Sequence, residues 1–356
     1  SVCWQLRIFS DGDCTFADKQ ERHGFMKRLE AISISALDLA PIRAEGGAQQ
    51  ALHNSLALAR HVEQLGFTRF WVAEHHNMDG IASSATSVLI GYLAAGTSRI
   101  RVGAGGVMLP NHSPLVIAEQ FGTLETLYPG RIDLGLGRAP GTDLLTARAL
   151  RRERSGSADD FPAEVEELQG YLGARVPGQQ VIAIPGCGTH VPLWLLGSSL
   201  FSAQLAGIKG LPYAFASHFA PRLMHEAIRV YRNHFKPSAV LDKPYVMLGV
   251  PLIAADTDAQ AEYLATSSYL RILALIRGQS LQQQPPVDSM DGRWTAQERQ
   301  AVGEFLGLAM IGGPQKIRAR LELLLEQTGA DELIFTGDMY EFADRLRSYE
   351  ILAELR

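Results

Sequence analysis

The sequence contains little cysteine, with only Cys3, Cys14 and Cys187 among 356 residues. Three widely separated cysteines cannot build a disulfide framework or the paired-cysteine spacing of a structural zinc site. Such sparse use of cysteine is typical of reducing compartments, so we expect a cytoplasmic protein.

The sequence also lacks a long hydrophobic run and a strong charge of one sign. No apolar segment reaches the ~20 residues that a membrane-spanning helix needs. The formal net charge is −5, which gives no basic footprint for nucleic acid. We therefore expect neither a membrane nor a nucleic acid as a partner. Hydrophobic residues make up 46% of the chain, which is enough for a large core.

Residues 1–25 differ from the rest of the chain because they show no clear periodicity. They lack the apolar segment and the small-residue cleavage site of a secretory signal. Met26 then begins a segment typical of a cytosolic protein, a basic start followed by a strand. We expect residues 1–25 to be an extension, natural or added, and residues 26–356 to form a single domain.

From residue 30 onward, apolar segments of strand length alternate with segments of helical periodicity. Eight strand–helix pairs follow one another, which is typical of parallel strands joined by right-handed crossovers. An open doubly wound sheet and a closed (β/α)8 TIM barrel both fit this alternation. The count of eight and the absence of an interdomain linker favour the barrel, with residues 278–294 as an insertion over it. The expected strands are 30–39, 68–75, 99–109, 130–137, 191–197, 211–218, 244–255 and 330–338.

In a TIM barrel the active site lies at the carboxyl ends of the strands. Polar and glycine residues gather at most of these ends, and this convergence is a stronger signal than any single motif. The segments concerned are Ser35 to Asp38, Glu74 to His76, residues 103–106, residues 135–143, residues 196–202, and residues 217–218.

The second strand ends on Glu74, His75 and His76. Successive side chains of an extended chain point to opposite faces, so the two histidines do not readily bind one metal ion. No zincin-like spacing of histidine and carboxylate is present, and we predict no metal site. One histidine facing the barrel mouth suits proton transfer near neutral pH, although a structural histidine is the alternative. Glu74 then pairs with a neighbouring cation or histidine.

A phosphate site is predicted after the fourth and fifth strands. Ser198 and Ser199 open a helix, whose free N–H groups and partial positive charge attract anions. Arg138 ends the neighbouring strand and could contact the same phosphate. Plain N-capping by serine and a structural salt bridge for Arg138 are the alternatives. The glycines at 135, 137 and 141 do not have the spacing of a dinucleotide fingerprint, which argues against a Rossmann fold.

The third strand ends on "GAGG", residues 103–106, which has almost no side chains. Glycine weakens a strand unless its backbone must approach something closely. A flat ring lying on this backbone would explain the run, and a bulge or a tight barrel corner would explain it equally well.

These segments carry a family resemblance. The chain resembles the bacterial luciferase-like flavin-dependent monooxygenases, most closely the YhbW-like subgroup, from about residue 33 to its end. The resemblance implies a (β/α)8 barrel, reduced FMN used with O2, and a homodimer. The matching stretches are "WVAEHHN", "GGVMLPNHSPLVIAEQFGTLETLYPGRIDLGLGRAPGTD", "LLGSSLFSAQLAGIKGLPYAFASHFAP" and "DELIF".

The resemblance also implies roles for individual residues. His75 matches a catalytically important histidine, and Arg138 matches the family's phosphate-binding arginine. The phosphate-binding positions after the fifth strand match Ser198, Ser199 and Ser202, the first of which is glutamate in luciferase. The non-proline cis peptide under the flavin ring falls at Gly105–Gly106. Luciferase's reactive cysteine is replaced here by Gly137, which removes any argument for a thiol role.

The function that we expect is oxygenation of a small organic substrate by reduced FMN and O2. A separate flavin reductase would supply the reduced FMN, because no nicotinamide site is visible in the sequence. A deazaflavin-dependent oxidoreductase and a non-catalytic flavin-binding protein are the alternatives. The helices at 84–95 and 114–127 carry small and apolar residues that suit either a dimer interface or the barrel: Gly91, Ala94, Ala95, Val116, Ile117, Phe121 and Leu124.

Overall fold

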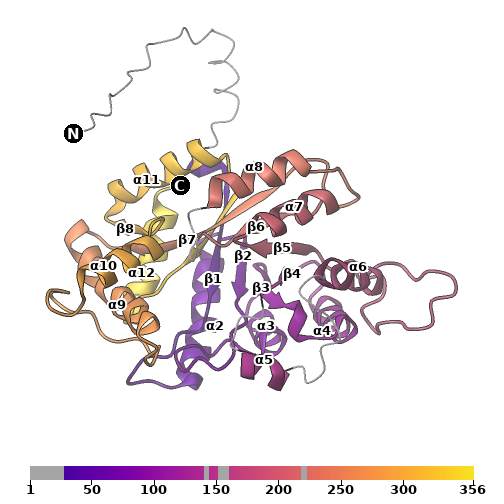
Figure 1. The fold of residues 1–356 in the computed structure, drawn as a ribbon, viewed down its shortest axis with the longest axis horizontal. Coiled ribbons are helices and arrows are strands. Elements are labelled where there is room, and N and C mark those ends of the chain that lie inside the picture. Colours follow the sequence, from indigo (N-terminus) through magenta and orange to yellow (C-terminus); the bar gives the residue numbers. More distant parts are fainter. Residues whose placement is uncertain (1–27, 140–143, 151–159, 218–222) are drawn as a thin grey trace, which may run out of the picture.

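The chain folds into a closed barrel of parallel strands surrounded by helices (Figure 1). The computed structural model describes residues 28–139, 144–150, 160–217 and 223–356. In the ring, β1 to β7 follow in sequence order and β9 closes it between β7 and β1. The predicted (β/α)8 TIM barrel is therefore confirmed. Residues 1–25 lie outside the described residues, so the division at that point stays a prediction.

The strands and helices have the following bounds. The strands are β1 (Ser33–Asp38), β2 (Arg69–Val72), β3 (Arg101–Met108), β4 (Ile132–Gly137), β5 (Leu193–Gly197), β6 (Tyr213–Phe215), β7 (Val246–Ala254), β8 (Met310–Gly312) and β9 (Glu332–Thr336). The helices are α2 (Ala48–Gln64), α3 (Thr86–Ala95), α4 (Pro114–Leu127), α5 (Leu144–Leu150), α6 (Phe161–Leu172), α7 (Leu200–Lys209), α8 (Met224–His234), α9 (Asp258–Ile276), α10 (Ala296–Phe305), α11 (Pro314–Thr328) and α12 (Phe342–Glu354), with single 3-10 turns η1 (Leu29–Ala31) and η2 (Leu109–Asn111).

The residue pattern explains these elements. Every residue of β4 is buried, as expected for a parallel strand covered on both faces. Helix α2 buries Ala51, Ser55, Leu58 and Val62, one stripe at helical spacing, and exposes its other side. The helix ends before Gly66, whose φ of 81° suits glycine at a helix stop.

The sequence left open whether the apolar residues of α3 and α4 face the barrel or a dimer interface, and their burial decides this for some of them. Ala94, Ile117, Phe121 and Leu124 are buried against the barrel, which corrects any assignment of these four to a dimer interface. The large apolar side chains exposed on these helices are Val88, Tyr92, Val116 and Leu127, of which only Val116 belongs to the set named from the sequence.

The segment between α9 and β9 contains elements that the sequence pattern did not reveal. Helices α10 and α11 flank β8, which pairs with the carboxyl end of β7 from Leu252 to Ala254. Strand β8 has only three residues, too few for a visible period of two. These elements lie with α9 and α12 on one side of the barrel in Figure 1.

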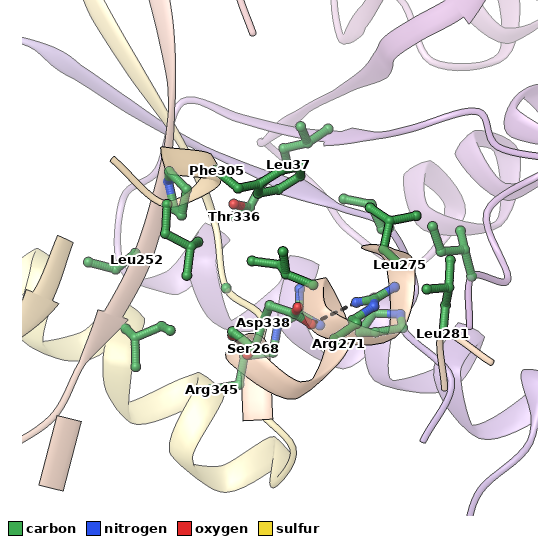
Figure 2. Close-up of a pocket in the computed structure, with 18 of the residues that line it drawn as sticks. Leu37, Leu252, Ser268, Arg271, Leu275, Leu281, Phe305, Thr336, Asp338 and Arg345 are labelled. Atoms are coloured by element: carbon green, nitrogen blue, oxygen red, sulfur yellow. Dashed lines mark hydrogen bonds and ion pairs between the residues drawn. The ribbon is translucent and has the colours of Figure 1, made fainter. Parts of the chain in front are cut away.

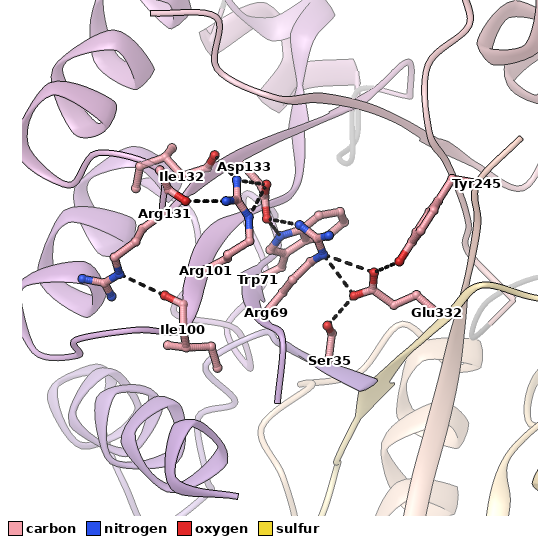
Figure 3. Close-up of polar contacts among 11 residues, drawn as sticks. Ser35, Arg69, Trp71, Ile100, Arg101, Arg131, Ile132, Asp133, Tyr245 and Glu332 are labelled. Carbon is pink, nitrogen blue, oxygen red and sulfur yellow. Dashed lines mark hydrogen bonds and ion pairs between the residues drawn. The ribbon is translucent and has the colours of Figure 1, made fainter. Parts of the chain in front are cut away.

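The barrel interior has a charged layer at its amino end (Figure 3). Asp133 accepts hydrogen bonds from Arg69 Nη1 at 2.8 Å and from Arg101 Nη2 at 2.6 Å. Arg69 also pairs with Glu332, at 3.0 Å between Nε and Oε1. Ser35 donates to Glu332 at 2.5 Å, which corrects its predicted place at the barrel mouth. An apolar layer covers these charges: Leu37, Trp71, Ala73, Trp194, Ala214, Met247 and Ile334.

Candidate active site

A cavity of about 290 Å³ lies at the carboxyl end of the barrel, beside β1, β7 and β9 (Figure 2). This volume is just below the usual range for small-molecule sites, ~300–1,000 Å³. Apolar side chains form most of its wall, with polar groups from α9 and from the segment after β9. The lining residues are Leu37, Leu39, Pro41, His75, Met78, Ile81, Pro251, Leu252, Ile253, Ser268, Arg271, Ile272, Leu275, Leu281, Phe305, Leu306, Thr336, Gly337, Asp338 and Arg345.

The two adjacent histidines after β2 diverge, as the alternation of an extended chain predicts. His75 lines the cavity. His76 Nε2 instead lies 2.8 Å from Oε1 of the buried Glu74. Position 75 is thus the one of the pair that faces the interior of the mouth.

Glu74 joins the ends of β2 and β3. Its Oε1 also lies 2.8 Å from His112 Nε2, and its Oε2 accepts the N–H of Met108 at 2.9 Å. Burial alone would raise the pKa of Glu74, but His112, His76 and the Met108 N–H together hold that pKa below its ordinary value. The carboxylate is therefore ionised at neutral pH and fixes the loop that carries His75. The predicted pairing of Glu74 with a neighbouring histidine is confirmed.

The turn after the histidines holds the insertion 278–294 over the mouth. Asn77 has a φ of 55°, a left-handed conformation that asparagine adopts in turns. Asp79 accepts the N–H of Leu281 at 2.8 Å. A Cβ at Gly80 would lie 2.0 Å from the Leu281 carbonyl oxygen, so only glycine allows this approach. Leu281 in turn lines the cavity, which confirms the predicted position of the insertion.

The glycine run of β3 forms part of the barrel wall below the mouth. The register with β4 shifts between Ala104 and Val107, as at a bulge, which was one of the explanations that the sequence left open. A Cβ at Gly103 would lie 2.5 Å from the Asp133 carbonyl oxygen, and one at Gly106 would lie 2.7 Å from that of Gly135. Close contact with β4 therefore requires these glycines whatever ligand binds above them. The peptide between Gly105 and Gly106 is cis, as predicted.

The predicted phosphate residues meet where β4 and β5 end. Ser199 caps α7, and its Oγ lies 2.9 Å from the Oγ of the buried Ser202. The guanidinium of Arg138 stacks over the ring of Phe201 in the first turn of α7, with its Cζ 4.4 Å from the ring centroid. Ser198 lies between β5 and Ser199, partly buried. A cation, two hydroxyls and a helix N-terminus thus come together, a donor set that fits a phosphate.

The strand order relates this phosphate-type site to the cavity. In the ring of eight, β4 lies opposite β9 and β5 lies opposite β1. The cavity beside β9 and β1 is thus across the mouth from Arg138 and α7. Strands β2 and β3, which carry His75 and the Gly105–Gly106 peptide, lie between these two sides. A ligand that reached from one side of the mouth to the other would pass the carboxyl ends of β2 and β3.

Comparison with known proteins identifies the family. The sequence profile described as luciferase-like monooxygenase matches residues 32–332. The chain belongs to the luciferase-like monooxygenase family. The resemblance drawn from the sequence is confirmed at this level, while the YhbW-like subgroup stays a prediction.

Several known proteins are similar to the chain over nearly their whole length. YvbT of Bacillus subtilis (strain 168) is 56% identical over 90% of this chain and 96% of its own. A protein of Escherichia coli (strain K12) named luciferase-like monooxygenase is 52% identical over 92% of this chain and 98% of its own. The crystal structure of apo-MsnO8 has a TM-score of 0.81 at 36% identity, covering 91% of this chain and 98% of that one.

Gly137 stands where the luciferase-like resemblance places a reactive cysteine, and the space around it is limited. A Cβ at this position would lie 2.7 Å from Met108 Sδ. A cysteine side chain here would therefore require Met108 to move. The absence of the luciferase cysteine is thus consistent with local packing.

Three residues of the candidate site were not predicted from the sequence. His112 directly follows the 3-10 turn η2, and Arg271 and Asp338 come from α9 and from the segment after β9. Asp338 sits at the carboxyl end of a barrel strand, which was the available signal for it. Arg271 had none, because a charged residue in an amphipathic helix usually faces solvent.

Two further features of the described residues bear on function. In those ranges, no group of three or more histidine, cysteine, aspartate or glutamate side chains is arranged to hold a metal ion. Among the helices within the same ranges, none combines the length and the apolar character that crossing a membrane requires.

Proposed function

We propose that this luciferase-like protein is an FMN-dependent monooxygenase that oxygenates a small organic substrate with O2. The observation that carries the proposal is the pairing of Arg138 with the N-terminus of α7, across the barrel mouth from an apolar cavity. Family membership supports a monooxygenase over the deazaflavin-dependent and non-catalytic alternatives. We further propose a cytoplasmic location and a separate reductase as the source of reduced FMN.

In this proposal Arg138, Ser198, Ser199 and Ser202 would hold the FMN phosphate, and the backbone at Gly105–Gly106 would contact the flavin ring. Bound reduced FMN would supply the activation of O2, since such chemistry belongs to the cofactor. The apolar lining of the cavity keeps water away from the reacting atoms. His75 lines that cavity and can hold or release a proton at a ring nitrogen.

The experiment that tests the function mixes the protein with photoreduced FMN and then with O2 in a stopped-flow instrument. On the protein, reduced FMN should disappear well before oxidised FMN returns, whereas in free solution the two events coincide. Replacing Arg138 by leucine should abolish the delay at the same FMN concentration, because a charge-assisted contact contributes ~10- to 100-fold to affinity. Reoxidation of FMN at its free-solution rate on the wild-type protein would refute the proposal, and selective binding of a deazaflavin would favour the alternative.

We also propose a homodimer that uses the outer faces of α3 and α4. Val88 and Leu127 have 73% and 63% of their surface exposed, and Tyr92 and Val116 accompany them. Light scattering at micromolar concentration should give twice the chain mass of 38.9 kDa. Val88→Glu should shift the mass toward the monomer, since a charge cannot be buried unpaired. Leu323→Glu, on the exposed face of α11, is the matched control, and a monomeric wild-type protein would contradict the proposal.

A further inference from the structure

The cavity beside β1, β7 and β9 contains charged groups, yet they neutralise one another (Figure 2). Arg271 Nη1 lies 2.8 Å from Asp338 Oδ1, and Arg345 Nη2 lies 2.7 Å from Asp38 Oδ1. Each lining arginine therefore has its own carboxylate. The remaining lining is mainly leucine, isoleucine, proline and phenylalanine. Within the part of the chain that the structure describes, the cavity therefore offers an apolar surface on which both arginines are paired with carboxylates.

Arg271 is held on both of its terminal nitrogens. While Nη1 pairs with Asp338, Nη2 donates to the Gly80 carbonyl oxygen at 3.2 Å. Only 12% of the Arg271 side chain is exposed, against 34% for Asp338. An anion entering the cavity would have to displace Asp338 from Arg271 before it could pair with the guanidinium.

Asp338 is fixed by several groups, so it does not readily leave. Gln283 Nε2 donates to the same Oδ1 that meets Arg271. Ser268 Oγ donates to the Asp338 carbonyl oxygen at 2.7 Å, which ties the backbone to α9. Helix α9, the insertion and the segment after β9 therefore hold Asp338 against Arg271 together.

We propose that the cavity binds a neutral, mainly apolar organic molecule and that Asp338 sets this preference by neutralising Arg271. The inference rests on the proposed function, whose substrate class it names. A neutral apolar molecule gains by leaving water for this lining. An anion loses its hydration there and meets no free arginine among the described lining residues, which disfavours its binding. Asp338 is thus a specificity-determining residue for the substrate.

The test uses two fluorescent probes of nearly equal shape, 2-acetylnaphthalene and 2-naphthoate, which differ by a methyl ketone and a carboxylate. Binding to the full chain is titrated at about pH 8.5, above the range in which histidines ordinarily titrate. No FMN is added, so the result is independent of whether the protein uses FMN. We expect the ketone to bind at least about tenfold more tightly than the carboxylate.

Asp338→Asn should leave the charge of Arg271 uncompensated and raise the affinity for 2-naphthoate by about 10- to 100-fold. The affinity for 2-acetylnaphthalene should change little. The double variant Arg271→Gln/Asp338→Asn should lose that gain, because the guanidinium is then absent. Circular dichroism of each variant shows that it is folded. If Asp338→Asn does not fold, the double variant and the wild-type ratio of the two affinities still decide the question.

A pair of variants in α9 shows whether the probe occupies this cavity. Ile272 lines it, and Ile276, one turn later, is exposed and does not. Ile272→Phe should lower the affinity for the ketone by about tenfold or more, whereas Ile276→Phe should leave that affinity unchanged. The proposal is overturned if wild-type protein binds neither probe or prefers 2-naphthoate, if Asp338→Asn leaves the ratio unchanged, or if Ile272→Phe and Ile276→Phe behave alike.

Discussion

His75→Ala should slow the reaction of reduced FMN with O2 on the protein by about 100-fold or more and leave FMN affinity nearly unchanged. A positioned acid–base group contributes ~10²- to 10⁴-fold to a rate. His75 lines the cavity, whereas the proposed phosphate contacts come from Arg138 and α7. The variant should therefore change the rate of the reaction with O2 without changing the affinity for FMN. Stopped-flow absorbance gives the rate of loss of reduced FMN, and titration of FMN fluorescence gives the affinity.

The pH profile of that rate distinguishes proton transfer from a structural role. A histidine that exchanges a proton gives an inflection between about pH 5 and 8, and His75→Ala should remove it. His53→Ala, on the exposed face of α2, is the matched control and should keep both the rate and the inflection. A variant at position 75 that binds FMN poorly but reacts at the wild-type rate would contradict the catalytic role.

Asp133→Asn should lower the free energy of unfolding by about 3–5 kcal/mol, as expected when one member of a buried charge network loses its charge. Asp133 is fully buried and accepts hydrogen bonds from Arg69, Arg101 and Trp71. Asparagine keeps the shape but removes the charge that both arginines need. Burial alone would lower the pKa of Arg69, yet Asp133 and Glu332 raise it above its ordinary value. The arginine stays charged in the variant and becomes undercompensated.

Urea unfolding followed by tryptophan fluorescence measures this loss, since Trp71 and Trp194 lie beside the network. Asp256→Asn is the matched control because Asp256 forms an exposed pair with Arg347 at 2.8 Å. Exposed ion pairs contribute ~0–1 kcal/mol, so the control should unfold almost like the wild type. Equal midpoints for the two variants would show that the charged layer at the amino end of the barrel does not stabilise the fold.

Much of the fold could be predicted from the sequence because local patterns carry it. The strands that are buried on both faces read as continuous apolar runs, and α2 shows a single buried stripe. Eight such pairs with no linker indicated a closed barrel. Strand β8 was missed because its three residues owe their extended shape to pairing with β7, a contact that leaves no period in the sequence.

The candidate site could be predicted only in part. His75, Arg138 and the serines of α7 follow strands directly, so the barrel rule and the family resemblance both pointed to them. Ser35 was assigned to the wrong end of the barrel because the bounds of β1 could not be read from the sequence. Ser35 lies in the first half of that strand, and a residue's position along a strand decides which end of the barrel it faces. The sequence did not show which apolar residues of α3 and α4 face the barrel. The structure does, because Phe121 is buried and Val116 is exposed.

The sequence by itself determined the barrel, the family and the strand ends at which chemistry would be expected. It could do so because periodicity and short motifs are local properties of the chain. The family resemblance pointed to His75 rather than His76, but only the tertiary structure showed that the His75 side chain lines the cavity and that Glu74 joins β2 to β3. The pairing of Arg271 with Asp338 is likewise a tertiary result. The two residues lie far apart in the sequence, and their charges cancel only because α9 and the end of β9 share one wall of the barrel mouth.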